Sequence, residues 1–106
     1  MTPEVFVKEF EELKEYIGEG YFSEGSEISR LSRLQAAGFS ASQIELTKEL
    51  VSEALTDALY TVLLGLEGSA SISRHQEMYK LLDESGQELT GKIESLAWER
   101  FHGKNT

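Results

Sequence analysis

The longest helical pattern in the chain lies between Ser40 and Gly65. Ser40 is followed three residues later by Gln43, which is the spacing of a capping box, so a helix is expected to begin here. Gly65 is the expected end, because helices often stop at a residue that accepts a left-handed conformation. The pattern predicts one long central helix over about residues 41–64. Its apolar positions recur at spacings of three, four and seven, and they are Ile44, Val51, Leu55, Ala58, Leu59, Val62, Leu63 and Leu66.

The two halves of this helix differ in polarity. The first half, up to Asp57, is amphipathic, whereas the stretch from Ala58 to Leu66 is apolar nearly all round, which indicates burial on several sides. That stretch is about half of the roughly 20 residues that a membrane span requires, so we interpret it as a buried helix. Its apolar surface exceeds what short neighbours easily cover. We therefore expect a homodimer through this half and the C-terminal helix.

Three shorter helical patterns flank the long one, and they cover residues 3–17, 27–37 and 91–102. Each follows a residue that caps helices well, and each ends near a glycine; the caps are Thr2, Ser26 and Thr90. We expect the outer face of the first helix to be solvated, since it is rich in glutamate: Glu9, Glu11, Glu12, Glu15 and Glu19.

Residues 72–84 fit two structures. Ile72, Tyr79 and Leu82 fit a helix that ends before Gly86. The same region also fits a strand, a bend at Ser85-Gly86 and a return strand, and we favour this hairpin, over about residues 78–90. The expected fold is mainly α, a compact bundle of four helices around one long central helix with a small C-terminal β-hairpin. An all-α fold is the alternative.

Composition narrows the class of protein. The 106 residues suit a single helical domain, residues 1–106. Lysine and arginine number 10 against 19 aspartates and glutamates, a net charge of −9 that opposes binding to nucleic acid or to anionic membranes. The chain has no cysteine, and its acidic N-terminus does not resemble a signal peptide, so a cytoplasmic location is expected. The overall character is that of small bacterial cytosolic proteins.

Four acidic residues repeat at a spacing of four along the long helix: Glu45, Glu49, Glu53 and Asp57. This row is either a solvated face or a docking edge for a basic partner. Metal binding is disfavoured because no histidine accompanies the row. The preceding segment, RLQAAGFSASQI, resembles the joint of helix-turn-helix DNA binders, but a recognition helix with this row would oppose DNA phosphates with carboxylates.

Residues with catalytic potential are few. The Gly/Ser-rich stretch GLEGSASIS lacks the patterns of a P-loop and of a nucleophile elbow. His75, with Tyr79 nearby, is a candidate for a small pocket at this corner. Glu99 and His102 form a single Glu-x-x-His motif, whereas di-iron bundles need two. No cofactor or metal is therefore expected.

Trp98 is either a core residue or, if it is exposed, the anchor for a protein partner, since a large exposed aromatic side chain on an acidic domain is typical of interfaces. Tyr60 and Phe101 could join it. The first hypothesis is a non-enzymatic interaction protein, of the inhibitor or immunity type, that docks a basic partner. A small enzyme or ligand-binding domain that uses His75 is the second, and a helix-turn-helix regulator is the third.

Overall fold

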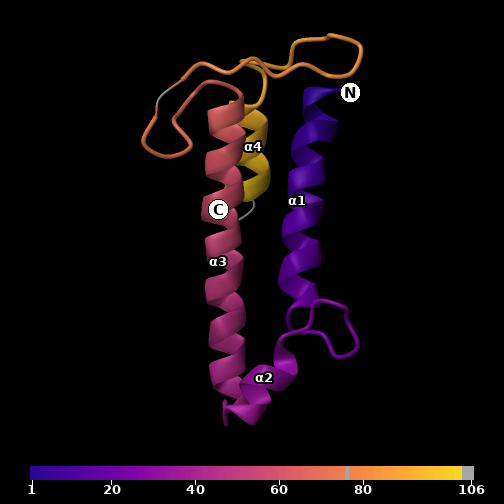
Figure 1. Cartoon of the computed structure of the whole chain (residues 1–106), viewed down its shortest axis with the longest axis vertical. Helices are drawn as coiled ribbons and strands as arrows, with labels where there is room; N and C mark the ends of the chain where they lie inside the picture. Colours follow the sequence, from indigo (N-terminus) through magenta and orange to yellow (C-terminus); the bar gives the residue numbers. More distant parts are fainter. Residues whose placement is uncertain (76, 104–106) are drawn as a thin grey trace.

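The computed structural model of the chain describes residues 1–75 and 77–103, which form four α-helices and no β-strand. In chain order they are α1 (Pro3–Gly20), α2 (Leu31–Ala36), α3 (Ala41–Leu66) and α4 (Glu94–Phe101). α1 and α3 run antiparallel, α2 crosses at the lower end, and α4 lies only against the upper half (Figure 1). The predicted mainly helical fold of four helices is confirmed.

The molecule is elongated because α3 is long. The principal extents are 49 × 28 × 27 Å, and the radius of gyration is 16.5 Å. A compact domain of 100 residues has a radius of gyration of about 13 Å. The upper end holds parts of α1 and α3, all of α4, and the crossing segment, residues 67–75 and 77–93, whereas the lower end holds the other parts of α1 and α3, the loop 21–30 and α2 (Figure 1). The lower half of α3 therefore has fewer neighbours than the upper half.

α3 begins where its sequence predicts. The Ser40 hydroxyl accepts a hydrogen bond from the Gln43 amide, and the Gln43 side chain accepts one from the Ser40 amide. The predicted end at Gly65 is wrong by one residue, since the helix continues to Leu66. Gly65 lies inside the helix because the Ile72 side chain packs directly on it, where any Cβ would overlap. The left-handed glycine is Gly68, with a φ of 88°.

Two of the shorter helices are shorter than predicted. α2 begins after Arg30 rather than after Ser26, whose hydroxyl accepts a hydrogen bond from the Ile28 amide in a turn. α4 begins at Glu94, and Thr90 does not cap it. The Thr90 hydroxyl instead accepts a hydrogen bond from the Leu81 amide.

The predicted β-hairpin over residues 78–90 is wrong, and so is the alternative helix before Gly86. The described residues there form a bend with a single antiparallel bridge, between Leu82 and Glu88. Gly86 has a φ of 86° at this bend. The ladder stops because the Leu81 amide bonds to the Thr90 hydroxyl instead of to a strand carbonyl.

The buried core lies at the upper end of the molecule. It is built from one residue of α1, one of α3 and four from the stretch that ends in α4: Val7, Leu63, Leu89, Ile93, Ala97 and Phe101. Burial of this apolar surface is the main force that holds the three helices together. Residues 41–57 of α3 contribute no fully buried side chain.

Two buried glutamates tie the elements of the upper end together. Glu67, only 4% exposed, accepts hydrogen bonds from the backbone amides of Ile93 (3.1 Å) and Glu94 (2.9 Å), so it supplies the acceptors that α4 lacks at its start. The Arg100 guanidinium donates to the Glu11 carboxylate at 2.8 Å. The expected solvation of Glu11 on the outer face of α1 is therefore wrong, since it is 8% exposed.

Candidate functional site

The four carboxylates that repeat along α3 line one surface groove. This acidic groove, with a volume of about 540 Å³, runs along the first half of α3. α1 contributes Lys14 to its wall, and the C-terminal end of α4 contributes His102. The groove residues on α3 are Glu45, Lys48, Glu49, Ser52, Glu53, Thr56 and Asp57. The spacing of four places the acids on one side of the helix, and the packing of α1 and α4 closes the groove around them.

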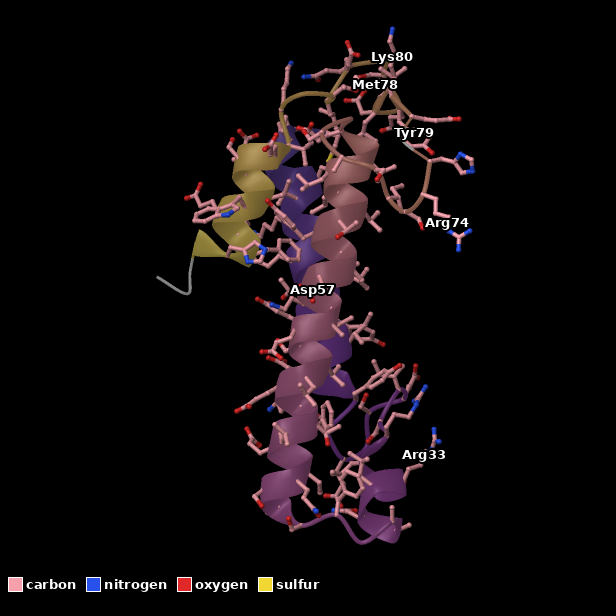
Figure 2. All side chains as sticks on the ribbon, turned by 90° about the vertical axis from the view of Figure 1, so that its left-hand side faces the viewer. Arg33, Asp57, Arg74, Met78, Tyr79 and Lys80 are labelled. Carbon is pink, nitrogen blue, oxygen red and sulfur yellow. The ribbon has the colours of Figure 1, made fainter. Side chains whose placement is uncertain are left out.

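The net charge of the groove is negative. Its four carboxylates face only two ammonium groups, those of Lys14 and Lys48. Within residues 1–75 and 77–103, none of the four carboxylates forms an ion pair. Figure 2 shows Asp57 near the middle of α3, far from Arg33 at one end and from Arg74 and Lys80 at the other. The carboxylates are therefore available to cations from outside the chain.

An aromatic cluster lies at the α4 end of the acidic groove. The His102 ring contacts Tyr60 edge-on, with ring centroids 4.7 Å apart, and lies 6.3 Å from the Trp98 ring. Trp98 is 50% exposed. Tyr60 and Trp98 line a second hollow of about 490 Å³ with Gly91, Glu94 and Ser95. Since His102 also lines the acidic groove, the aromatic cluster continues the same surface.

The electrostatics of Tyr60 reflect its position between the core and this surface. Burial raises the pKa of the Tyr60 hydroxyl, and the negative charge of Glu94 raises it further. The phenol therefore stays protonated at neutral pH and can donate a hydrogen bond. This combination of a protonated phenol, an indole and adjacent carboxylates suits recognition of a polar or cationic side chain more than it suits chemistry.

The other predicted site residues lie elsewhere. His75 and Tyr79 are both exposed, on the segment that crosses the upper end, and neither lines the two hollows. In Figure 2, Tyr79 lies with Met78 and Lys80 beyond the end of α3. Met78 and Thr90 approach the glycine-rich corner at Gly68 instead.

The described residues contain no group of three or more His, Asp or Glu side chains that could hold a metal ion.

The histidine of the single Glu-x-x-His motif, His102, packs on Tyr60. Its place in the site was missed in the sequence. The spacing of four indicates that His102 lies on the same side as Trp98, but the contact with Tyr60 depends on the packing of α4 on α3.

In the part of the chain that the structure describes, no helix has the length and apolar character needed to span a membrane. No model of a known protein family matches the chain, and neither a curated protein nor a solved structure shows significant similarity to it.

Proposed function

We propose that this chain is a non-enzymatic protein–protein interaction module, of the inhibitor or immunity type, that docks a basic partner in its acidic groove. The observation that carries the proposal is the groove itself. It gathers four carboxylates without ion pairs, and it leads into a cluster with a half-exposed tryptophan. Unpaired charges of one sign attract and orient a partner of the opposite sign.

The acidic groove and the aromatic cluster have different roles in this proposal. Exposed carboxylates contribute mainly to the rate of association and to the choice of partner, and their effect weakens with salt. A large aromatic side chain that is covered on binding contributes most of the affinity. Trp98 and Tyr60 are the residues placed for that second role.

The test compares two variants with the same change of charge. One carries Glu45→Gln, Glu49→Gln and Glu53→Gln in the groove, and the control carries Glu9→Gln, Glu12→Gln and Glu24→Gln, three exposed positions outside it. Proteins captured from native lysate at low salt are identified by mass spectrometry. We expect a partner that binds the wild type and the control, is lost at high salt, and is lost with the groove variant. Equal capture by both variants would contradict the role of the groove.

Trp98→Ala provides an independent test of the anchor. The side chain is half exposed, so its removal should leave the fold intact. The loss of a central aromatic residue at an interface lowers affinity by about 30-fold or more. An unchanged affinity, measured by calorimetry with the captured partner, would show that Trp98 lies outside the interface.

A homodimer through the upper half of α3 and α4 is the second candidate, in which Trp98 would contact a second copy instead of a foreign partner. The half-exposed Trp98 on α4, together with the total exposed area of the chain, favours it. The chain exposes 7261 Å², whereas a compact monomer of 11.9 kDa exposes about 6,000 Å². The excess exceeds the roughly 800 Å² that each partner buries in a standard interface. Light scattering coupled to size exclusion tests it, and a monomer at micromolar concentration would contradict it.

The remaining hypotheses have less support. A ligand-binding domain or enzyme built on His75 and Tyr79 has less support because neither side chain lines the acidic groove or the second hollow. A helix-turn-helix regulator would need cations on α3, whose only cationic residue is Lys48. A cytoplasmic location stays a prediction.

A further inference from the structure

A row of apolar side chains runs along α3 directly beside the four carboxylates. Each member follows one of the acids by one residue, and all four are exposed: Leu46, Leu50, Ala54 and Ala58. Leu46 and Leu50 are each 55% exposed. At a rise of about 1.5 Å per residue, the row extends over about 18 Å of one helix face. We call it the apolar row.

The apolar row is unpartnered in this chain. α1, α2 and α4 leave all four residues in contact with solvent, although leucines prefer burial. Contiguous exposed apolar side chains next to charged ones are typical of protein interaction sites. The row and the acidic row are parallel and equally long. Together they form a two-part surface, apolar on one side and negative on the other.

We propose that the apolar row and the acidic row together bind an amphipathic α-helix of the partner, with lysines or arginines along one edge of its apolar face. The proposal rests on the proposed function, since it specifies the partner of the same four carboxylates, which lie between the groove and the apolar row. The aliphatic face of the partner helix packs on Leu46, Leu50 and the two alanines. Its cationic edge lies over the carboxylates.

The spacing of both rows favours a helix as the occupant. Rows of side chains four residues apart form ridges, and helices commonly pack by fitting such ridges into the grooves of another helix. A partner helix has the same repeat of about 6 Å, so its contacts stay in register over the whole row. A strand would need free backbone groups to pair with, and the interior of a helix offers none. The two alanines let a partner backbone approach closely.

Charge disfavours a second copy as the occupant. A second α3 placed on the apolar row would bring its own four carboxylates to the interface and only one cation, Lys48. Like charges at an interface oppose association. A basic amphipathic helix supplies the missing cations, so it is the better complement.

The experiment measures binding of a fluorescein-labelled synthetic peptide to the full chain by fluorescence anisotropy. The peptide forms a helix of about five turns, with leucine and alanine repeated every four residues and lysine in the adjacent row. One control peptide has the same composition in scrambled order, and the other has glutamate in place of lysine. We expect binding of the first peptide only, with an affinity that falls as salt is added. No binding of the first peptide, or equal binding of the scrambled one, overturns the proposal.

Two pairs of chain variants locate the contact. Leu46→Ser with Leu50→Ser changes the apolar row, and Val5→Ser with Leu13→Ser changes two similarly exposed residues of α1. The first pair should lower affinity for the peptide at least about tenfold, and the second should leave it unchanged. Circular dichroism verifies that both variants remain folded.

The outcomes separate this proposal from the proposed function. If the triple glutamine variant of the groove weakens peptide binding but Leu46→Ser with Leu50→Ser does not, the acidic groove docks cations without the apolar row, and the helix proposal fails alone. If neither variant weakens binding, both proposals fail. If light scattering shows a dimer that Leu46→Ser with Leu50→Ser converts to a monomer, a second copy covers the row and the helix proposal is overturned.

Discussion

The two halves of α3 belong to one continuous helix but have opposite environments. The upper half, residues 58–66, packs against α1, α4 and the crossing segment, and it contains the buried Leu63 and Gly65. The lower half, residues 41–57, has no fully buried residue and carries most of the acidic groove and of the apolar row. The difference indicates that the upper half stabilises the fold and the lower half presents a surface.

This division depends on the continuity of the helix. A helix propagates more easily than it nucleates, so the packed upper half supports the exposed turns that precede it. The capping box at Ser40 satisfies backbone donors at the far end. The lower half can therefore present its side chains rigidly without a core of its own, and this rigidity lowers the entropic cost of binding.

The largest expected effect is on the free energy of unfolding, and it should differ between the two halves of α3 when the same Leu→Ala substitution is made in each. Leu63→Ala opens a cavity in the core and should lower the free energy of unfolding by about 2–5 kcal/mol. Leu50→Ala removes a half-exposed side chain and should change it by less than about 0.5 kcal/mol. Urea unfolding followed by circular dichroism measures both. Similar losses from the two variants would contradict the division of α3.

A smaller effect is expected where the crossing segment contacts the helix. Gly65→Ala would place a methyl group against the Ile72 side chain, and this overpacking should cost about 1–3 kcal/mol. Gly18→Ala, in α1, is the matched control, because its methyl group would reach Leu55 at an ordinary distance of 3.9 Å. The control should be neutral or more stable by up to about 1 kcal/mol. Ile72→Ala should restore the stability that Gly65→Ala removes. If it does not, the overpacking does not arise from the contact with Ile72.

The sequence predicts the local features of this fold well. The starts of α1 and α3 depend on hydrogen bonds between residues three apart, so Thr2 and Ser40 could be identified as caps. The acidic row is equally local, since it follows from the spacing of four on one helix. These features need no knowledge of the neighbouring elements.

Features that depend on distant partners could not be predicted. Glu11 reads as a solvated residue in the sequence, but it meets Arg100, which is 89 residues away. Glu67 bonds to Ile93 across 26 residues, and this contact fixes the start of α4. The hairpin prediction failed for a different reason, since the Thr90 side chain, nine residues from Leu81, accepts the hydrogen bond of the Leu81 amide in place of a backbone carbonyl. The meeting of His102 with the acidic groove likewise requires the packing of α4 on α3.

The crossing segment is sensitive to acid through Asp83. Hydrogen bonds from the Ser85 hydroxyl, then from the Gln87 amide, lower the pKa of this carboxyl from 3.8 to about 2. Because the carboxyl has a lower pKa in the folded state than in the unfolded state, it stabilises the folded state at pH values above the unfolded pKa. This stabilisation is lost as the pH falls towards 2. Asp83→Asn should therefore be less stable than the wild type at pH 7, and the difference should narrow from about pH 4 to 2.

Chemical unfolding at several pH values measures this narrowing. Glu84→Gln, at the exposed neighbouring position, is the control for the loss of one carboxylate. Asp83 belongs to the segment that covers only the upper half of α3, so this experiment tests the stability of the packed end of the molecule. A constant difference between wild type and Asp83→Asn across this range would show that the hydrogen bonds at Asp83 do not stabilise the fold.

The smallest expected effect lies in the lower half, and it has the opposite sign. Glu49 is four residues from both Glu45 and Glu53, so it takes part in two like-charge pairs on one helix face. Each such pair costs a few tenths of a kcal/mol, so Glu49→Gln should raise the free energy of unfolding by about 0.5 kcal/mol at low salt. The control is Lys8→Gln, which removes the exposed ion pair with Glu12 and should lower stability slightly.

High salt should reduce the differences in stability of both Glu49→Gln and Lys8→Gln from the wild type. Exposed charges more than about 10 Å apart are screened at 0.1 M salt, and closer pairs are weakened. The same Glu49→Gln variant should bind the basic peptide more weakly than the wild type. A substitution that stabilises the fold and weakens binding indicates that the residue serves recognition at a cost in stability. If Glu49→Gln lowers stability, the acidic row supports the fold, and the lower half of α3 is not a separate binding surface.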